Sequence, residues 1–176
     1  MFWQKDALFV RKERNSFKTI ESSDVLRHQE TRLMPYTPAF LYALVADVEQ
    51  YPHFLPWCRT VEITKRNKTL LEATVGLEIA GFQEDFRSRV FLEPTHKIAI
   101  SYLKGGPLKS LESTWHFKPK ENDTRSCQVD FDITFSLSSV LLDKLLGTAL
   151  QKIAQEMVKA FEKRAKELSL KEKMRP

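Results

Sequence analysis

Cysteine is scarce in this chain of 176 residues, which has only Cys58 and Cys127, far apart in the sequence. Neither belongs to a Cys-x-x-Cys pair or to a cysteine–histidine spacing that suits zinc. The pattern therefore excludes a disulfide framework and a structural zinc site. It indicates a protein of a reducing compartment.

Long hydrophobic runs are also missing. The run Leu41–Ala46 is far shorter than the roughly 20 apolar residues that span a bilayer, so no membrane-spanning helix is expected. The first 26 residues have no apolar signal-peptide core, and Asp6, Glu13 and Glu21 interrupt the acid-poor composition of a transit peptide. We expect residues 1–26 to form a poorly ordered extension of a cytoplasmic protein.

Recognisable catalytic motifs are absent. HExxH, GxSxG, the P-loop and GxGxxG do not occur, and the four histidines do not lie at metal-ligand spacings. Asp130 and Asp132 share one strand face, but that face is the polar one, so we interpret them as surface carboxylates rather than an acid–base pair. Glu112, near a Gly-Gly-Pro turn, is a further candidate for the rim of a cavity. The sequence favours a protein that is not an enzyme and binds no metal.

What is present begins with the segment Tyr51–Cys58, which has four large apolar side chains and two prolines in eight positions. Pro52 and Pro56 each lack a backbone donor, so neither an ordinary helix nor a central strand can include both. We expect an irregular connection that either plugs the core or borders a ligand cavity. A short helix capped by Thr37, with Phe40, Leu41, Leu44, Val45 and Val48 on one face, comes before it.

Alternating apolar and polar residues dominate the roughly eighty residues that follow, a pattern typical of antiparallel strands with one buried face. In the clearest run, Cys127, Val129, Phe131, Ile133 and Phe135 point one way. Turn residues separate the runs at 66–68, 80–81, 94–95, 105–107 and 119–124. With a first strand over Arg27–Met34, the pattern predicts about seven strands.

From Ser138 the apolar period becomes helical for roughly thirty residues. One stripe has Leu142, Leu146, Ala149, Ile153, Met157 and Ala160, with Leu145, Leu150 and Phe161 beside it. A long amphipathic helix after an antiparallel meander has only the inner face of the sheet to pack against. We therefore predict an α+β fold, with one domain over residues 27–168, in which a curved antiparallel sheet of about seven strands wraps around a long C-terminal helix.

Small residues at inward positions leave room inside such a fold. Ala73, Ser88 and Ser113 have inward parity, and two loops, Tyr51–Trp57 and Leu103–Leu111, can gate the space between sheet and helix. A fully packed core with ordinary loops is the alternative reading of the same residues.

The end of the chain is basic. From Lys159 to Pro176 seven bases face three acids, which accounts for 4 of the formal net charge of +5. Such a helix end and tail, residues 169–176 in particular, is either solvated or a surface that meets phosphates.

The residues VADVEQYPHFLPWC at 45–58, LESTWHF at 111–117 and VDF at 129–131 carry a resemblance. Through them the chain resembles the coenzyme Q-binding branch of the START-like (polyketide cyclase) superfamily, which also contains the bacterial ribosome association toxins called RatA. The resemblance covers residues 27–168. It implies a helix-grip fold with a lipid-sized tunnel, in agreement with the periodicity.

The first function that the resemblance implies is a ubiquinone chaperone that supports respiration, with ubiquinone as a bound ligand and no cofactor. Isoprenoid carbon would be buried in the tunnel, and Trp57 and Trp115 would bracket the quinone ring. Contact with an anionic inner membrane is implied too, on the matrix side of mitochondria in a eukaryote. The expected ligand-binding residues are Phe54, Leu55, Trp57, Val75, Leu77, Trp115, Phe131, Leu146 and Ile153.

The second implied function is a toxin that binds the large ribosomal subunit and blocks subunit association. Either a membrane or ribosomal RNA would then meet the basic helix end, through Lys159, Lys163, Arg164 and Lys166. No DNA contact is expected. An aromatase or cyclase activity, known elsewhere in the superfamily, is disfavoured because no inward acid–base pair is found.

Overall fold

The computed structural model describes residues 25–174, apart from the side chain of Lys173. A seven-stranded antiparallel sheet is followed by one long helix, which confirms the predicted fold. The expected extension 1–26 lies outside the described residues except for its end, where Leu26 already belongs to a strand. The elements are β1 (Leu26–Met34), α1 (Pro38–Ala46), the 3-10 helix η1 (Val48–His53), β2 (Cys58–Arg66), β3 (Leu70–Ile79), β4 (Phe82–Glu93), β5 (Lys97–Gly105), β6 (Leu108–Lys120), β7 (Asp123–Leu137) and α2 (Val140–Lys173).

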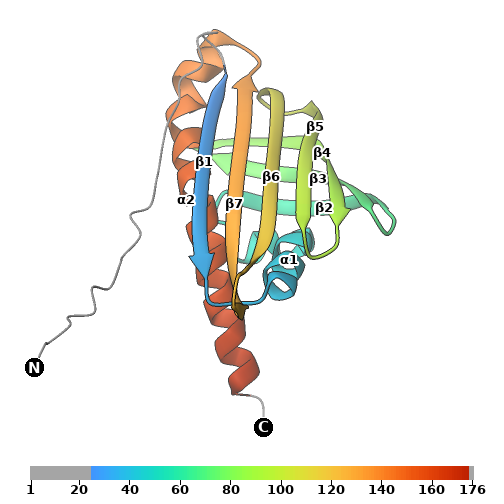
Figure 1. Cartoon of the computed structure of the whole chain (residues 1–176). Coiled ribbons are helices and arrows are strands. Elements are labelled where there is room, and N and C mark those ends of the chain that lie inside the picture. Colours follow the sequence, from blue (N-terminus) through green and yellow to red (C-terminus); the bar gives the residue numbers. More distant parts are fainter. Residues whose placement is uncertain (1–24, 175–176) are drawn as a thin grey trace, which may run out of the picture.

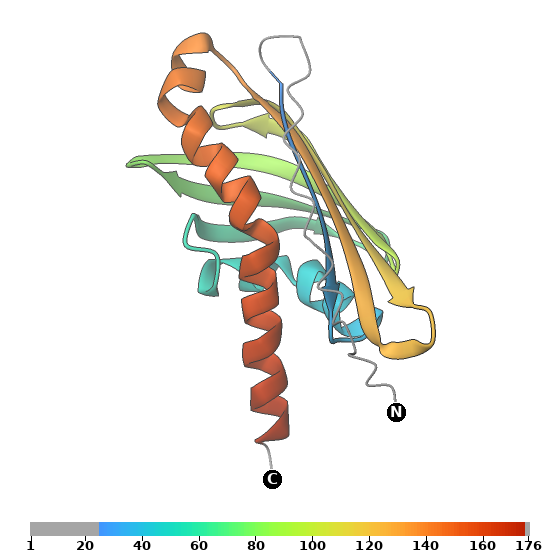
Figure 2. The same cartoon turned by 60° about the vertical axis from the view of Figure 1, so that its left-hand side comes forward.

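The strands lie in the order β1-β7-β6-β5-β4-β3-β2, so β1 closes the sheet beside the last strand and β2 forms the other edge. Hairpins join all consecutive strands from β2 to β7. The sheet is strongly bent: strands β1, β7, β6 and β5 cross the direction of β2, β3 and β4 at a steep angle (Figure 1). Figure 2 shows α2 crossing the concave side, with its C-terminal turns extending past the sheet.

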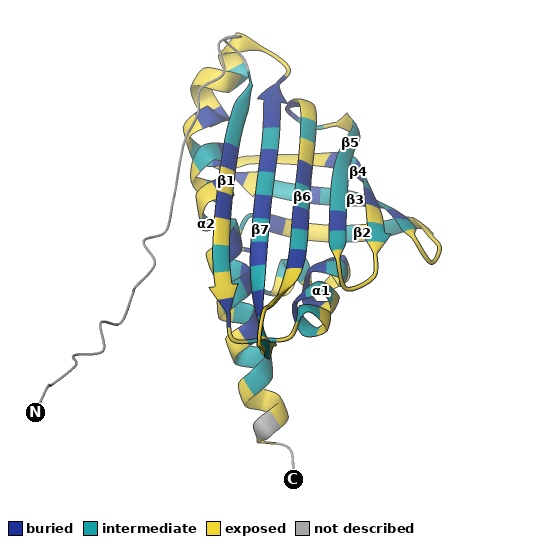
Figure 3. Ribbon diagram, viewed as in Figure 1, coloured by how far each residue is buried: buried dark blue, intermediate teal, exposed yellow. Residues whose placement is uncertain are grey.

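Strand β7 shows why the alternation predicts the fold correctly. Cys127, Val129, Phe131, Ile133 and Phe135 are all buried on the concave side (Figure 3). The opposite face is partly exposed, as a one-sided sheet requires. Ser136 differs, since it is buried despite its polar-face parity and its hydroxyl shares a 2.6 Å hydrogen bond with that of Ser110.

Glycine is required at the turn between β5 and β6. Gly105 has φ +94°, and a Cβ there would lie 2.8 Å from the carbonyl oxygen of Asp85 on β4. Left-handed backbone and lack of space both exclude a side chain. The turn between β6 and β7 is tighter than the predicted 119–124, because the strands extend to Lys120 and from Asp123.

Two short helices, α1 and η1, come before β2. Thr37 caps α1 by accepting a hydrogen bond from the backbone N–H of Phe40, as predicted. The segment Tyr51–Cys58 is neither an α-helix nor a strand until Cys58 begins β2, but its first three residues belong to η1, which the sequence did not indicate. Pro52 lies inside this 3-10 helix as its next-to-last residue, where it donates no backbone hydrogen bond.

Helix α2 begins at the cap Ser139, whose hydroxyl accepts a hydrogen bond from the N–H of Leu142. It continues to Lys173, five residues beyond the predicted boundary at 168. Its most buried arc is rotated from the predicted stripe, and Leu145, placed beside that stripe, is 51% exposed. The buried residues are Leu146, Leu150, Ala154, Val158, Phe161 and Ala165.

A buried charged cluster joins β1 to α2. Glu30, only 4% exposed, accepts a hydrogen bond from Arg32, whose other Nη lies 2.5 Å from Glu162 on α2. His28 Nε2 lies 3.5 Å from the second carboxylate oxygen of Glu30. The alternation of apolar and polar residues does not predict this cluster, because the cluster has charged residues on the inward face of the edge strand β1. It fixes the position of the helix across the sheet.

Arg32→Ala should lower the free energy of unfolding by about 3 kcal/mol, since it removes one partner of a buried ion pair. The matched control is Arg66→Ala, because Arg66 pairs with Glu49 on the surface, with both side chains about half exposed. That loss should cost less than about 1 kcal/mol. Urea unfolding measures both; equal effects would show that the β1–α2 cluster contributes little.

Candidate functional site

An apolar cavity of about 140 Å³ lies between the concave face of the sheet and α2. Side chains from η1, from the segment after it, from β2 to β7 and from α2 form its wall. The predicted alternative of a fully packed core is therefore wrong. Ala73, Ser88 and Ser113 all line the cavity, as their inward parity predicted.

Seven of the nine residues expected to bind the ligand line this cavity. They come from five separate parts of the chain, which the fold brings together: Leu55, Trp57, Val75, Leu77, Trp115, Phe131 and Ile153. Phe54 and Leu146 do not line it. Other lining residues, such as Ile133 and Met157, follow from the same periodicity.

Phe54 packs outside the cavity wall. Its ring meets the edges of Tyr51 and Phe161, with centroids 5.8 and 5.1 Å away, and the guanidinium of Arg164 lies 5.5 Å from the ring centroid. Phe54 lines a groove beside the cavity, so its contact with a ligand stays a prediction. An irregular segment has no parity from which to infer direction. Phe54 holds η1 against α2.

Leu146 is fully buried, at 1% exposure, but lies one helical turn before the part of α2 that faces the cavity. That part begins at Leu150 and includes Ile153, Ala154 and Met157. Helical periodicity predicts that Leu146 faces the sheet, but it does not predict which part of the helix lies over the cavity. Leu146 belongs to the packed core above the cavity.

Trp115 forms one side of the cavity as part of an aromatic cluster. Its ring centroid lies 4.4 Å from that of Phe131 and 5.0 Å from that of Phe161. These contacts fix the orientation of the indole by packing. Bracketing of a ring by Trp57 and Trp115 remains a prediction.

Two hydroxyl groups face an otherwise apolar wall. Ser88 and Ser113 are 3% and 6% exposed, and both line the cavity. They lie on β4 and β6, with β5 between them: Ser88 pairs with Tyr102, and Ser113 with Ile100. A hydroxyl in such a wall can donate a hydrogen bond to a ligand's oxygen.

Among the described residues that line the cavity, none is Asp, Glu, His, Lys or Arg. Its ionisable groups are a phenol and a thiol, and both are held neutral. The hydroxyl of Tyr51 donates a 2.6 Å hydrogen bond to the carbonyl of Val45, and burial raises its pKa far above the ordinary value. Burial also raises the pKa of Cys58 to about 11.

The cavity adjoins an open groove of about 630 Å³ between α2, the 54–57 segment and the end of β3. Trp57, Ile79 and Ile153 line both spaces. The groove is therefore the mouth of the cavity. Its rim is charged, with Lys152, Lys159 and Lys163 against Glu78 and Glu156.

The predicted second gate, Leu103–Leu111, is a tight hairpin rather than a loop, although Leu108 and Leu111 line the cavity. Glu112 was placed wrongly at the cavity rim. It pairs with Thr134 and Ser101 on the convex face, because strand parity continues to the end of β6.

The predicted surface bases do not form one set. Lys159, Lys163 and Lys166 are exposed. Arg164 is not, since its side chain is 16% exposed, covers Phe54 and lies 3.4 Å from Glu167. Arg164 is a packing residue rather than a surface contact.

The carboxylates of Asp130 and Asp132 lie on the convex face, as predicted. Lys118 and Thr31 bond Asp130, and Arg27 bonds Asp132 at 2.5 Å. Burial alone would raise the pKa of Asp130, but hydrogen bonds from Lys118, Thr31 and Gln128 together hold it below the ordinary value. Within the described residues, no group of three or more His, Cys, Asp or Glu is arranged to hold a metal ion. No described helix is long and apolar enough to cross a membrane.

Residues 34–162 match the family described as polyketide cyclase/dehydrase and lipid transport. The chain belongs to this family. A solved structure has the same fold: an aromatase/cyclase from Streptomyces superposes with a TM-score of 0.68 over 81% of this chain and 94% of that one, at 16% identity. That likeness shows the fold alone.

Other family members are more similar in sequence. The ribosome association toxin RatA of Rickettsia prowazekii is 37% identical over 82% of this chain and 99% of that relative. An 18 kDa protein from Caulobacter crescentus, solved in solution, is 32% identical with a TM-score of 0.63, over 81% of this chain and 97% of that one. A mitochondrial coenzyme Q-binding protein homologue of Xenopus laevis is 26% identical over 80% of this chain and 58% of its own length.

The two thiols should be unreactive in the folded protein. A pKa of about 11 for both Cys58 and Cys127 leaves roughly one thiolate in a thousand at pH 8. Because these values exceed the ordinary 9.0, the stability that the neutral thiols contribute is complete below about pH 9 and is lost as the pH rises through 11. We expect an aromatic disulfide reagent to label neither thiol within minutes, and both in denaturant. Rapid labelling of native protein would contradict this.

Proposed function

We propose that the cavity binds the ring of an isoprenoid quinone such as ubiquinone, and that the protein carries this lipid without transforming it. The observation that supports this most strongly is the apolar cavity whose wall includes the hydroxyls of Ser88 and Ser113. The homology to a coenzyme Q-binding protein supports the same ligand class.

The size of the cavity suits one end of such a lipid. A cavity of about 140 Å³ is comparable to engineered apolar cavities of ~150 Å³ that hold benzene. A complete long-chain quinone is too large for it. The ring therefore occupies the cavity, and the tail leaves through the groove past Trp57, Ile79 and Ile153.

The two hydroxyls favour a ligand that has oxygen acceptors over plain hydrocarbon. Strands one apart in a sheet are roughly 10 Å distant, so Ser88 and Ser113 approach the cavity from opposite sides of β5. A ring with carbonyl oxygens on opposite sides can accept a hydrogen bond from each. A fatty acyl chain can satisfy neither.

The absence of acid and base groups from the wall supports a binding role. Cyclisation needs proton transfer by positioned groups within hydrogen-bond reach of the substrate. Tyr51 and Cys58 are the ionisable groups of the wall, and burial keeps both protonated at neutral pH. We infer that the role is transport or storage rather than catalysis.

Ser88→Ala and Ser113→Ala should each weaken binding of a short-tailed ubiquinone about three- to tenfold, the equivalent of one hydrogen bond of ~1 kcal/mol. Quenching of tryptophan fluorescence on titration with the quinone measures it. Ser101→Ala, on the convex face of β5, is the matched control and should bind normally. A hydrocarbon of the same size as the quinone should bind all four proteins alike. Equal quinone affinity in every variant would refute the role of the hydroxyls.

Association with the ribosome is the second candidate. It is favoured by the relatives described as ribosome association toxins, among them those of Rickettsia prowazekii and Pseudomonas aeruginosa at 37% and 33% identity. The exposed bases Lys159, Lys163 and Lys166 would then contact RNA phosphates of the large subunit. The two surfaces overlap at the groove, because Lys159 and Lys163 line it too.

Cosedimentation with purified large ribosomal subunits over a salt series tests this candidate. Binding should weaken steeply with salt, and Lys159→Gln with Lys163→Gln and Lys166→Gln should reduce the salt slope by up to about 3. Lys68→Gln with Lys120→Gln, at two exposed positions outside α2, should leave the slope unchanged. No cosedimentation at low salt would exclude the ribosomal role and leave the quinone proposal intact.

A further inference from the structure

One side of α2 is exposed and has an unusual sequence. Leu141 and Leu145, 67% and 51% exposed, occupy its first two turns. Lys152, Lys159 and Lys163 follow at spacings of seven, seven and four residues, so all five residues lie on the same side of the helix. Solvated helix faces normally have polar residues where these leucines lie.

This side of the helix adjoins the mouth of the cavity. The three lysines line the groove, and Leu145 lies one turn before Ala149, which lines it too. Figure 2 shows the turn end of β3 and β4 next to the first half of α2. Phe82, 41% exposed, lies at that end on the concave parity and pairs with Ile79, a residue of both cavity and groove.

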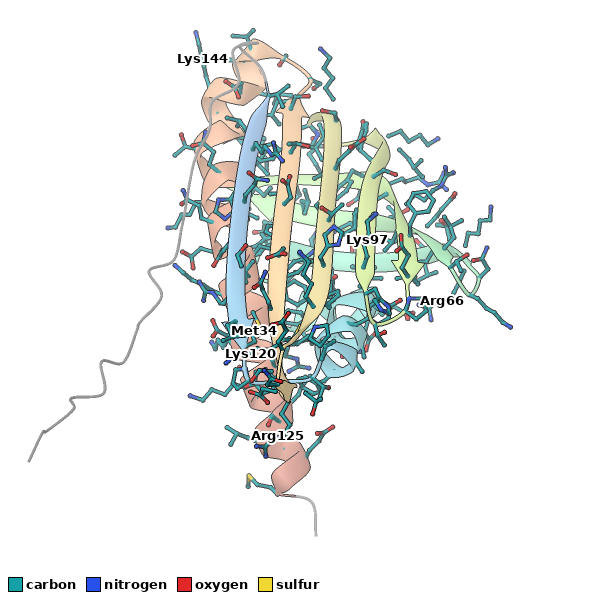
Figure 4. The ribbon with its side chains drawn as sticks, viewed as in Figure 1. Met34, Arg66, Lys97, Lys120, Arg125 and Lys144 are labelled. Atoms are coloured by element: carbon teal, nitrogen blue, oxygen red, sulfur yellow. The ribbon has the colours of Figure 1, made fainter. Side chains whose placement is uncertain are left out.

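The charge of this region is positive on balance. Three lysines face two carboxylates, Glu78 and Glu156, in the groove. The side chain of Lys144 projects from the end of the molecule where α2 begins (Figure 4), close in sequence to the exposed leucines. Leucine and phenylalanine surrounded by lysine is the composition of protein surfaces that enter the interface of an anionic bilayer.

We propose that this docking face, made of Leu141, Leu145, Lys152, Lys159, Lys163 and Phe82, binds the surface of an anionic lipid bilayer. The apolar residues insert between headgroups, the lysines contact lipid phosphates, and the groove opens directly into the acyl layer. RNA is less suitable as the partner, because two exposed leucines gain nothing from phosphates and cannot stack on bases as aromatic rings do. The inference rests on the proposed function, since it gives a lipid tail a path from cavity to membrane.

Flotation with phosphatidylcholine vesicles, with and without phosphatidylglycerol, tests the docking face on the whole chain. Wild type should float with the anionic vesicles. Leu141→Ser with Leu145→Ser should weaken binding at least tenfold, and Lys152→Gln with Lys163→Gln about fivefold for each lysine. Leu33→Ser, an equally exposed leucine on the convex face of β1, and Lys68→Gln with Lys120→Gln are the matched controls and should bind as wild type.

Three results would overturn the docking face: no flotation of wild type with anionic vesicles, unchanged binding of the leucine variant, or equal losses in the controls. Binding to large ribosomal subunits that depends on these lysines, with no binding to vesicles, would assign the surface to RNA instead. Because the vesicles contain no quinone and the quinone titration contains no vesicles, failure of one proposal is distinguishable from failure of the other. Circular dichroism of each variant shows whether it is folded.

Discussion

The structure depends on burial of one side of α2 against the concave face of the sheet. Helix and sheet each have a large apolar surface that only the other can cover. Leu146, Val158, Phe161 and Ala165 are almost completely buried in this contact. The bonds from Arg32 to Glu30 and Glu162 fix the helix to the edge strand β1, so the contact has one position rather than several.

The same contact creates the cavity. Trp115 and Phe161 form part of its wall, while Leu146 and Phe54 pack outside it. Elsewhere the wall has Ala73, Ser88 and Ser113, whose side chains are too short to reach the helix. A rigid frame and a small unfilled centre are what a binding protein for an apolar ring requires.

Strand alternation and helical periodicity were sufficient to predict the fold and the residues that line most of the cavity, because burial of one face determines both periods. These patterns failed where the direction of a side chain does not follow from the periodicity of the sequence. Phe54 lies in a segment without regular structure, and the guanidinium of Arg164 lies over its ring instead of extending into solvent. The ion pairs of Glu30 and the separation of α2 from the sheet after Leu146 depend on contacts between distant segments, which one sequence does not reveal.

Binding of a quinone in the cavity is tested most directly by solvent extraction of the protein purified from its native host, with quinone quantified by mass spectrometry. The control is Ala73→Leu, which fills part of the cavity from β3 without adding charge. A substantial fraction of wild-type chains should carry quinone, and the variant should carry little while remaining folded. If wild-type protein yields no quinone and does not take up added short-tailed ubiquinone, the proposal that the cavity binds a quinone is wrong.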